Sequence, residues 1–118
     1  MSASLPIRLS CDTARTVAFG GISAVYAGVG ATFSSPVRIF QLNNLTDTTL
    51  MFSYDGVNDH FPLSTLGYVI IDVAANQALT QGFFMGQGSR LYVRDMTAEG
   101  YNAATINAVW LTCYVGRV

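Results

Sequence analysis

The segment 37–63, VRIFQLNNLTDTTLMFSYDGVNDHFPL, decides the fold class of this chain. It contains three short runs rich in Val, Ile, Leu, Tyr and Phe, at 37–43, 49–54 and 60–63. Asn, Asp and Thr gather between the first two runs, and Asp, Gly and Asn gather between the last two. β-branched and aromatic residues favour strands, and connections made of these polar residues favour tight turns. The segment therefore predicts three consecutive antiparallel strands.

Strand-like runs continue on both sides of this segment. Five further runs have a similar composition, at 5–11, 67–73, 81–85, 90–95 and 106–117. The chain between the runs is too short for the crossover helices that a parallel sheet needs. We therefore predict an all-β fold, an antiparallel β-sandwich of jelly-roll or Greek-key type, with residues 1–118 forming a single domain.

One stretch departs from the strand pattern. From about residue 15 to residue 28, apolar side chains recur at three- and four-residue spacing, as in Phe19, Ile22 and Tyr26. This period is typical of an amphipathic helix, and the glycines that follow are a usual stop signal. We predict one short helix near residues 15–28, weakened in its middle by two adjacent glycines.

The composition indicates a surface that other molecules cover. Hydrophobic residues make up 51% of the chain and charged residues only 11%, so much of the surface must be uncharged. All six basic residues are Arg and the net charge is −1, which argues against a nucleic-acid partner. The start lacks the order of a signal peptide and no apolar run is long enough to span a bilayer, so we expect an origin in the cytoplasm and no membrane partner. Residues 1–6 suit a flexible arm.

The two cysteines, Cys11 and Cys113, fall in the first and last predicted strands. The alternation of apolar residues places both side chains on the inner face of the sandwich. We therefore expect two buried, reduced thiols rather than a disulfide.

The cluster Asp55, Asp59 and His60 raises the question of a metal site or an active site. A calcium loop needs oxygen ligands at alternate positions and a closing Glu, and a zinc site needs three or four His or Cys ligands; this chain offers neither pattern. The residue types instead fit a hairpin connection between 49–54 and 60–63. The triplet Asn44-Leu45-Thr46 matches a glycosylation motif, but without a secretory route we interpret it as accidental.

No pattern for catalysis or cofactor binding is present. His60 is the only histidine, no G-x-S-x-G elbow accompanies it, and the glycine-rich segment 20–30 has no Lys-Ser/Thr ending. We expect no enzymatic activity, no metal and no cofactor.

Aromatic residues and arginines on predicted strand faces indicate a protein interface. Arg90, Tyr92 and Arg94 share one face of a strand, and Tyr and Arg are enriched where proteins bind one another. Phe83 and Phe84 are consecutive, so at least one of them should face away from the core. These five residues are our candidate interface.

The chain resembles a known family in overall pattern. The succession AFGGISAVYAGVG (18–30), PVRIFQLNNLTDTTLMFSYDGVNDHFPL (36–63), GYVIIDVAANQ (67–77) and GSRLYVRD (88–95) is similar to small virion structural proteins of tailed bacteriophages, of which the jelly-roll capsid cement (decoration) proteins match best. The resemblance implies assembly in the cytoplasm of a bacterial host and function in the virion. It also implies binding to the major capsid protein or other virion proteins, with self-association as a dimer or trimer. It transfers no individual functional residue.

Two alternatives stay open at this point. The protein could be a neck or tail adaptor, or another tail-associated subunit. It could also be a carbohydrate-binding β-sandwich, for which exposed Trp110, Tyr101 and Tyr114 would supply stacking platforms, provided that Trp110 does not lie in the core.

Overall fold

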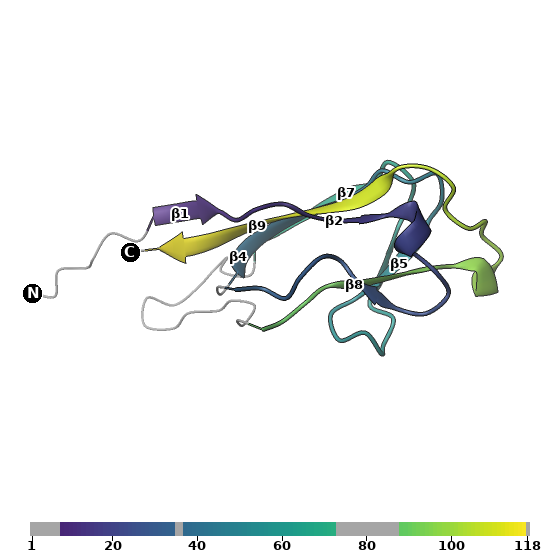
Figure 1. Cartoon of the computed structure of the whole chain (residues 1–118), viewed down its shortest axis with the longest axis horizontal. Helices are drawn as coiled ribbons and strands as arrows, with labels where there is room; N and C mark the ends of the chain where they lie inside the picture. Colours follow the sequence, from purple (N-terminus) through teal and green to yellow (C-terminus); the bar gives the residue numbers. More distant parts are fainter. Residues whose placement is uncertain (1–7, 35–36, 73–87, 118) are drawn as a thin grey trace, which may run out of the picture.

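The computed structural model describes residues 8–34, 37–72 and 88–117, and across these residues all regular structure is β-strand apart from two single turns of 3-10 helix. Sheet A contains β1 (Arg8–Cys11), β2 (Arg15–Ala18), β4 (Val37–Asn44), β7 (Tyr68–Asp72) and β9 (Ala108–Arg117). Sheet B contains β3 (Ala27–Gly28), β5 (Leu50–Ser53), β6 (Phe61–Leu63) and β8 (Tyr92–Asp95). Every strand pairing is antiparallel (Figure 1), which confirms the predicted β-sandwich.

The order of the strands is that of a jelly roll. Sheet A has the order β1-β9-β4-β7, and sheet B has the order β3-β8-β5-β6. β1 and β2 both pair with β9, at its end and its beginning, so they act as one interrupted strand. The pairs are then nested: β1 and β2 with β9, β3 with β8, β4 with β7, and β5 with β6. This nesting is what results when one long hairpin rolls up into two facing sheets.

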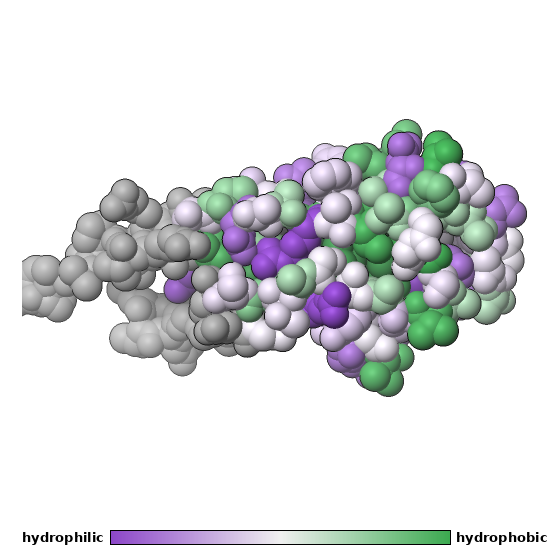
Figure 2. Space-filling model, viewed as in Figure 1, coloured by the Kyte–Doolittle hydropathy of each residue, from purple (hydrophilic) through white to green (hydrophobic). Residues whose placement is uncertain are grey.

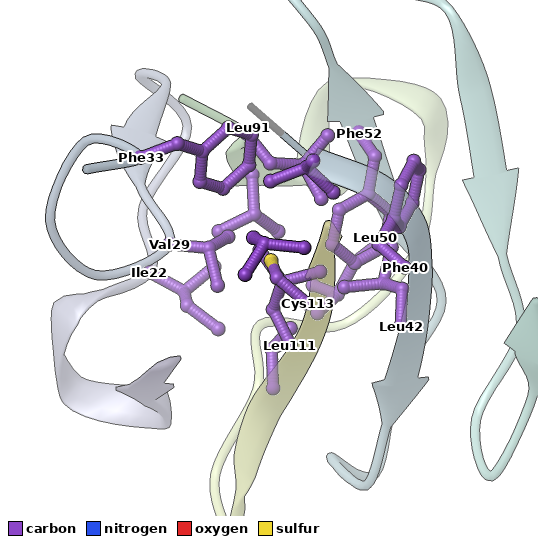
Figure 3. Close-up of a cluster of buried hydrophobic side chains, with 14 residues drawn as sticks. Ile22, Val29, Phe33, Phe40, Leu42, Leu50, Phe52, Leu91, Leu111 and Cys113 are labelled. Atoms are coloured by element: carbon purple, nitrogen blue, oxygen red, sulfur yellow. The ribbon is translucent and has the colours of Figure 1, made fainter. Parts of the chain in front are cut away.

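The core lies between the two sheets. On β4 the side chains of Phe40 and Leu42 are buried, whereas Gln41 between them is only partly covered, as the period of two requires. The same alternation buries every second residue of β9, from Val109 to Val115. Figure 3 shows side chains from both sheets meeting in one apolar cluster, with Phe52 and Leu50 of sheet B facing Phe40 of sheet A.

The predicted helix near residues 15–28 is wrong. The chain there forms β2, a single 3-10 turn named η1 (Phe19–Gly21), and then β3. Adjacent glycines disfavour a continuous helix, and the backbone of 15–18 gains a full ladder with β9 instead. Ile22 and Val29 still enter the core, but from irregular chain, so their helical spacing was coincidental.

The prediction for the cysteines is half wrong. Cys113 is buried in the core, as expected, and neither thiol is in a disulfide. Cys11 is exposed, because it pairs with Tyr114, whose side chain belongs to the outer face of sheet A. Cys11 and Cys113 therefore lie on opposite faces of sheet A.

Some predictions concern residues outside the described ranges. The proposed arm at 1–6 and the run 81–85, with Phe83 and Phe84, belong to this part of the chain. Within the ranges that the structure describes, no helix is long and apolar enough to cross a membrane.

Candidate functional site

The connection between β5 and β6 is a hairpin turn built around Asp55. Its Oδ1 accepts hydrogen bonds from the backbone N–H groups of Val57 and Asn58, each at 2.8 Å, and from the Ser53 hydroxyl at 2.8 Å. These bonds favour the ionised carboxylate, led by the Asn58 backbone, so they lower the pKa of Asp55 well below its ordinary value. The predicted hairpin is confirmed, and all the acceptor capacity of Asp55 Oδ1 is used by the turn itself.

The other end of this turn is tied to β8 by a cluster of charges. The Arg94 guanidinium binds Asp59 Oδ2 at 2.9 Å and both oxygens of Glu99 at 2.9 Å. Its carbon Cζ lies 5.7 Å from the centre of the Tyr26 ring, and the Tyr26 hydroxyl donates to Asp59 Oδ1 at 2.5 Å. We call these four residues the Arg94 cluster; the side chain of Arg94 is only 11% exposed within it.

This geometry shifts the pKa values of the cluster in consistent directions. The hydrogen bonds from Arg94 lower the pKa of Asp59 and of Glu99, and the same bonds, led by that to Glu99, raise the pKa of Arg94. Burial, together with the bond to Asp59, raises the pKa of Tyr26 to about 12. At neutral pH the cluster therefore holds one cation, two anions and a neutral phenol.

Tyr92 and Arg94 of the predicted row lie on one face of β8, whereas Arg90 lies just before the strand, and both arginines bind within the chain. Arg90 Nε donates to the carbonyl of Gly30 at 2.6 Å, and the guanidinium lies against Gly28, where a side chain would collide with it. The Tyr92 ring contacts Gly56 of the turn. The row therefore fastens neighbouring loops to sheet B, and Arg94 is not free to form forked bonds with a partner.

Asn44, in the glycosylation-type triplet, has a structural role that the sequence analysis missed. Its side chain is completely buried. The amide nitrogen donates to the carbonyls of Thr48 and Leu63, both at 2.9 Å, and the amide oxygen accepts from the backbone and hydroxyl of Thr46. Asn44 thus joins the β4–β5 loop to the end of β6 and the loop that follows it, and the folded chain offers no free amide for a glycan.

Around Asn44, four connections form one end of the molecule, opposite the start of β1 and the end of β9 (Figure 1). Backbone bonds link them: Leu45 N to Ala108 O at 3.1 Å, and Phe19 N to Asn107 O at 2.9 Å. The Thr65 hydroxyl also donates to the carbonyl of Thr46. This end is therefore a set of mutually fastened loops.

Apolar side chains project from these fastened loops. They are Phe19, Leu45, Leu66 and Ile106, which we call the apolar loop end. Leu66 is 73% exposed and has φ of +59°, a left-handed conformation that costs a leucine roughly 1–2 kcal/mol. Figure 2 shows hydrophobic residues (green) reaching the surface at this end of the molecule. Folding alone does not require a large apolar side chain at that position.

A second candidate surface is the outer face of sheet A. Asn43 of β4 is paired with Tyr68 of β7 on one side and with Trp110 of β9 on the other, so the three side chains form one row. Tyr68 is 65% exposed and Trp110 is 41% exposed, which means that Trp110 is not a core residue. Tyr114 shares this face but is half-buried, and Tyr101 lies in the β8–β9 connection instead.

The arrangement offers little for chemistry. His60 Nδ1 accepts a hydrogen bond from the Tyr54 backbone N–H at 2.9 Å, and no hydroxyl or thiol of the described chain bonds to this imidazole. Among the residues that the structure describes, no three His, Cys, Asp or Glu side chains come close enough to hold a metal ion. A surface groove of about 330 Å³ is lined by residues 12–16 with Gly30 and Ala31, and its one guanidinium, Arg15, is bound to Asp12 and to the Ala31 carbonyl.

Comparison with known proteins adds no relative: no protein-family model, curated protein or solved structure matches this chain.

Proposed function

We propose that the chain is a non-enzymatic structural protein of a bacteriophage virion, a capsid cement protein that binds across neighbouring capsid subunits. The observation that carries the proposal is the apolar loop end. A set of exposed apolar side chains on loops that are already fastened to one another can bind a partner without a large cost in ordering. The jelly roll is also an architecture that viral capsid proteins use.

The mechanism is a shift of equilibrium. A protein that binds the assembled shell better than its free subunits favours assembly by the free energy of that binding. Each contact can be modest, because many copies act on one particle. In this mechanism the chain needs a rigid docking surface and no reactive group.

The row Arg90, Tyr92 and Arg94 remains a predicted interface, but we rank it second. Its arginines already have partners in the chain, so docking there would have to exchange existing bonds for new ones. The exposed parts of the side chains in the apolar loop end face solvent, so docking there does not have to break existing bonds.

The first test is to count copies in particles purified from the producing phage, by quantitative mass spectrometry with the major shell protein as the standard. A ratio near one, or a simple fraction of one, supports a capsid cement. A few copies to a few dozen per particle would move the protein to the neck or tail. Absence from particles would overturn the virion proposal.

The second test locates the surface. Leu66→Asn removes the exposed apolar side chain. Asn adopts the left-handed conformation of this position more readily than Leu does, so the variant should still fold. We expect at least tenfold weaker re-attachment of this variant to stripped particles. Val57→Asn is the matched control, because Val57 is a similarly exposed apolar residue in the β5–β6 turn. If Tyr92→Ala releases the protein and Leu66→Asn does not, the interface is sheet B.

A further inference from the structure

The row Tyr68, Asn43 and Trp110 on the outer face of sheet A is not part of the apolar loop end, and its spacing and chemistry suit a different kind of ligand. Each residue lies on a neighbouring strand, so the two rings flank the Asn43 amide and are separated by two strand spacings, about 10 Å. Both rings are exposed on the same face of sheet A. Two platforms at this separation, with an amide between them, match the length of a disaccharide.

The adjacent row adds polar groups without charge. Gln41 of β4 is paired with Ile70 of β7 and with Thr112 of β9, so these residues share the outer face with the first row. The Gln41 Nε2 lies 3.5 Å from Asn43 Oδ1, a long contact that leaves most of the capacity of both amides unused. In the described chain, these two amides form no other hydrogen bond, and neither row contains an ionised side chain.

We propose that these two rows, formed by Tyr68, Asn43, Trp110, Ile70, Gln41 and Thr112, bind a neutral oligosaccharide. The faces of aromatic rings carry partial negative charge, which attracts the C–H groups on the flat side of a sugar ring. An amide offers one acceptor and two donors, and sugar hydroxyls can satisfy both kinds at once. We call this surface the sugar face.

A protein partner fits the sugar face less well. Buried polar groups in proteins are nearly always hydrogen-bonded, whereas here an amide with free donors lies at the centre of each of the two rows. A protein covering them would have to supply matching groups or leave them unsatisfied, at about 1–3 kcal/mol each. A sugar carries hydroxyls around its whole rim and needs no such special design.

The chain contains a built-in probe for this site. Trp110 is the only tryptophan of the 118 residues, so its fluorescence reports on the sugar face alone. The experiment screens the isolated protein on an array of neutral oligosaccharides and then titrates the best ligand while Trp110 emission is recorded. Cellohexaose and chitohexaose are the first soluble probes, and hexagalacturonate is the charged comparison.

We expect a saturable change in Trp110 emission with a neutral oligosaccharide, at least tenfold weaker binding in Tyr68→Ala and in Asn43→Ala, and weaker binding of the charged comparison. Tyr101→Ala is the matched control, because it removes an exposed ring that belongs to the β8–β9 connection and to neither row, and this variant should bind as the unchanged protein does. Circular dichroism of each variant checks the fold.

Two results would overturn the inference. One is an array without any bound neutral glycan while the protein is folded. The other is an emission change that depends on protein concentration instead of sugar, which would show that another copy covers this face. Neither result bears on the cement proposal, because the copy count and the Leu66→Asn test concern the apolar loop end.

Discussion

At the scale of single residues, Asn44 determines the shape of one end of the molecule. Its buried amide makes four hydrogen bonds to two separate segments of the chain. Another side chain in its place would leave carbonyls or N–H groups there unpaired. We expect Asn44→Ala to lower the free energy of unfolding by about 3 kcal/mol, measured by urea denaturation.

The control for this prediction is the next residue along the chain. Asn43→Ala changes the same residue type on the same strand, but its side chain lies on the outer face, so its effect should stay within about 0.5 kcal/mol. Equal losses in the two variants would mean that the buried network of Asn44 contributes little.

Asn44 also shows where sequence reasoning reaches its limit at this scale. The sequence analysis interpreted the triplet as an accidental match on the ground of cellular route, and it could not show that the amide is buried. The bonds of Asn44 run to Thr48, Leu63 and Ser64, and the last two are brought near only by the folding of sheet B. Nothing local in the sequence carries that information.

At the scale of elements, the Arg94 cluster holds the β5–β6 turn against β8. Its carboxylates, Asp59 and Glu99, have pKa values below the ordinary 3.8 and 4.5. Their contribution to stability is therefore fully present above the ordinary values and is lost as the pH falls through the lower folded values. We expect the turn to stay docked at neutral pH and to release only in acid, at pH values below the ordinary pKa values of these two carboxyl groups.

The measurement is a titration of carboxyl chemical shifts by NMR. Arg94→Met keeps the apolar stem and removes the donors, so the midpoints of Asp59 and Glu99 should rise toward their ordinary values. Asp47 is an internal control: bonds from Thr105, which take no part in the Arg94 cluster, lower its pKa, and these are untouched by the substitution. Unchanged midpoints for Asp59 in Arg94→Met would refute the role of the cluster.

Some strands could be predicted from the sequence and others could not. Strands such as β4 and β9 were predictable because their alternation is long enough to reveal the period. β2 and β3 were not, because four and two residues among glycines show no clear period, and their pairing with distant β9 and β8 decides their conformation. The sequence analysis named Trp110 as a stacking platform but could not bring Tyr68 next to it, since the two residues are aligned only through β4.

At the scale of the whole molecule, β9 is the strand on which sheet A depends, because β1, β2 and β4 all pair with it. The general architecture followed from the many short strands and short connections, whereas the nested strand order needed the pairings themselves. Cys113 lies near the middle of β9, fully buried in the core that both sheets share. Its thiol can therefore report on whether the two sheets separate in one step.

We expect iodoacetamide to modify the native protein only at Cys11, which is exposed. Cys113 should not react, because it is inaccessible and because burial raises the pKa of its thiol to about 11, which leaves almost no thiolate at neutral pH. In the variant Cys11→Ser, which changes only an exposed side chain, labelling of Cys113 should appear with increasing urea along the same transition as the Trp110 fluorescence. Coincident curves mean that the jelly roll unfolds as one cooperative unit. Labelling of Cys113 at urea concentrations where Trp110 emission is still native would contradict this, since it would require the core face of β9 to open while its outer face stays in place.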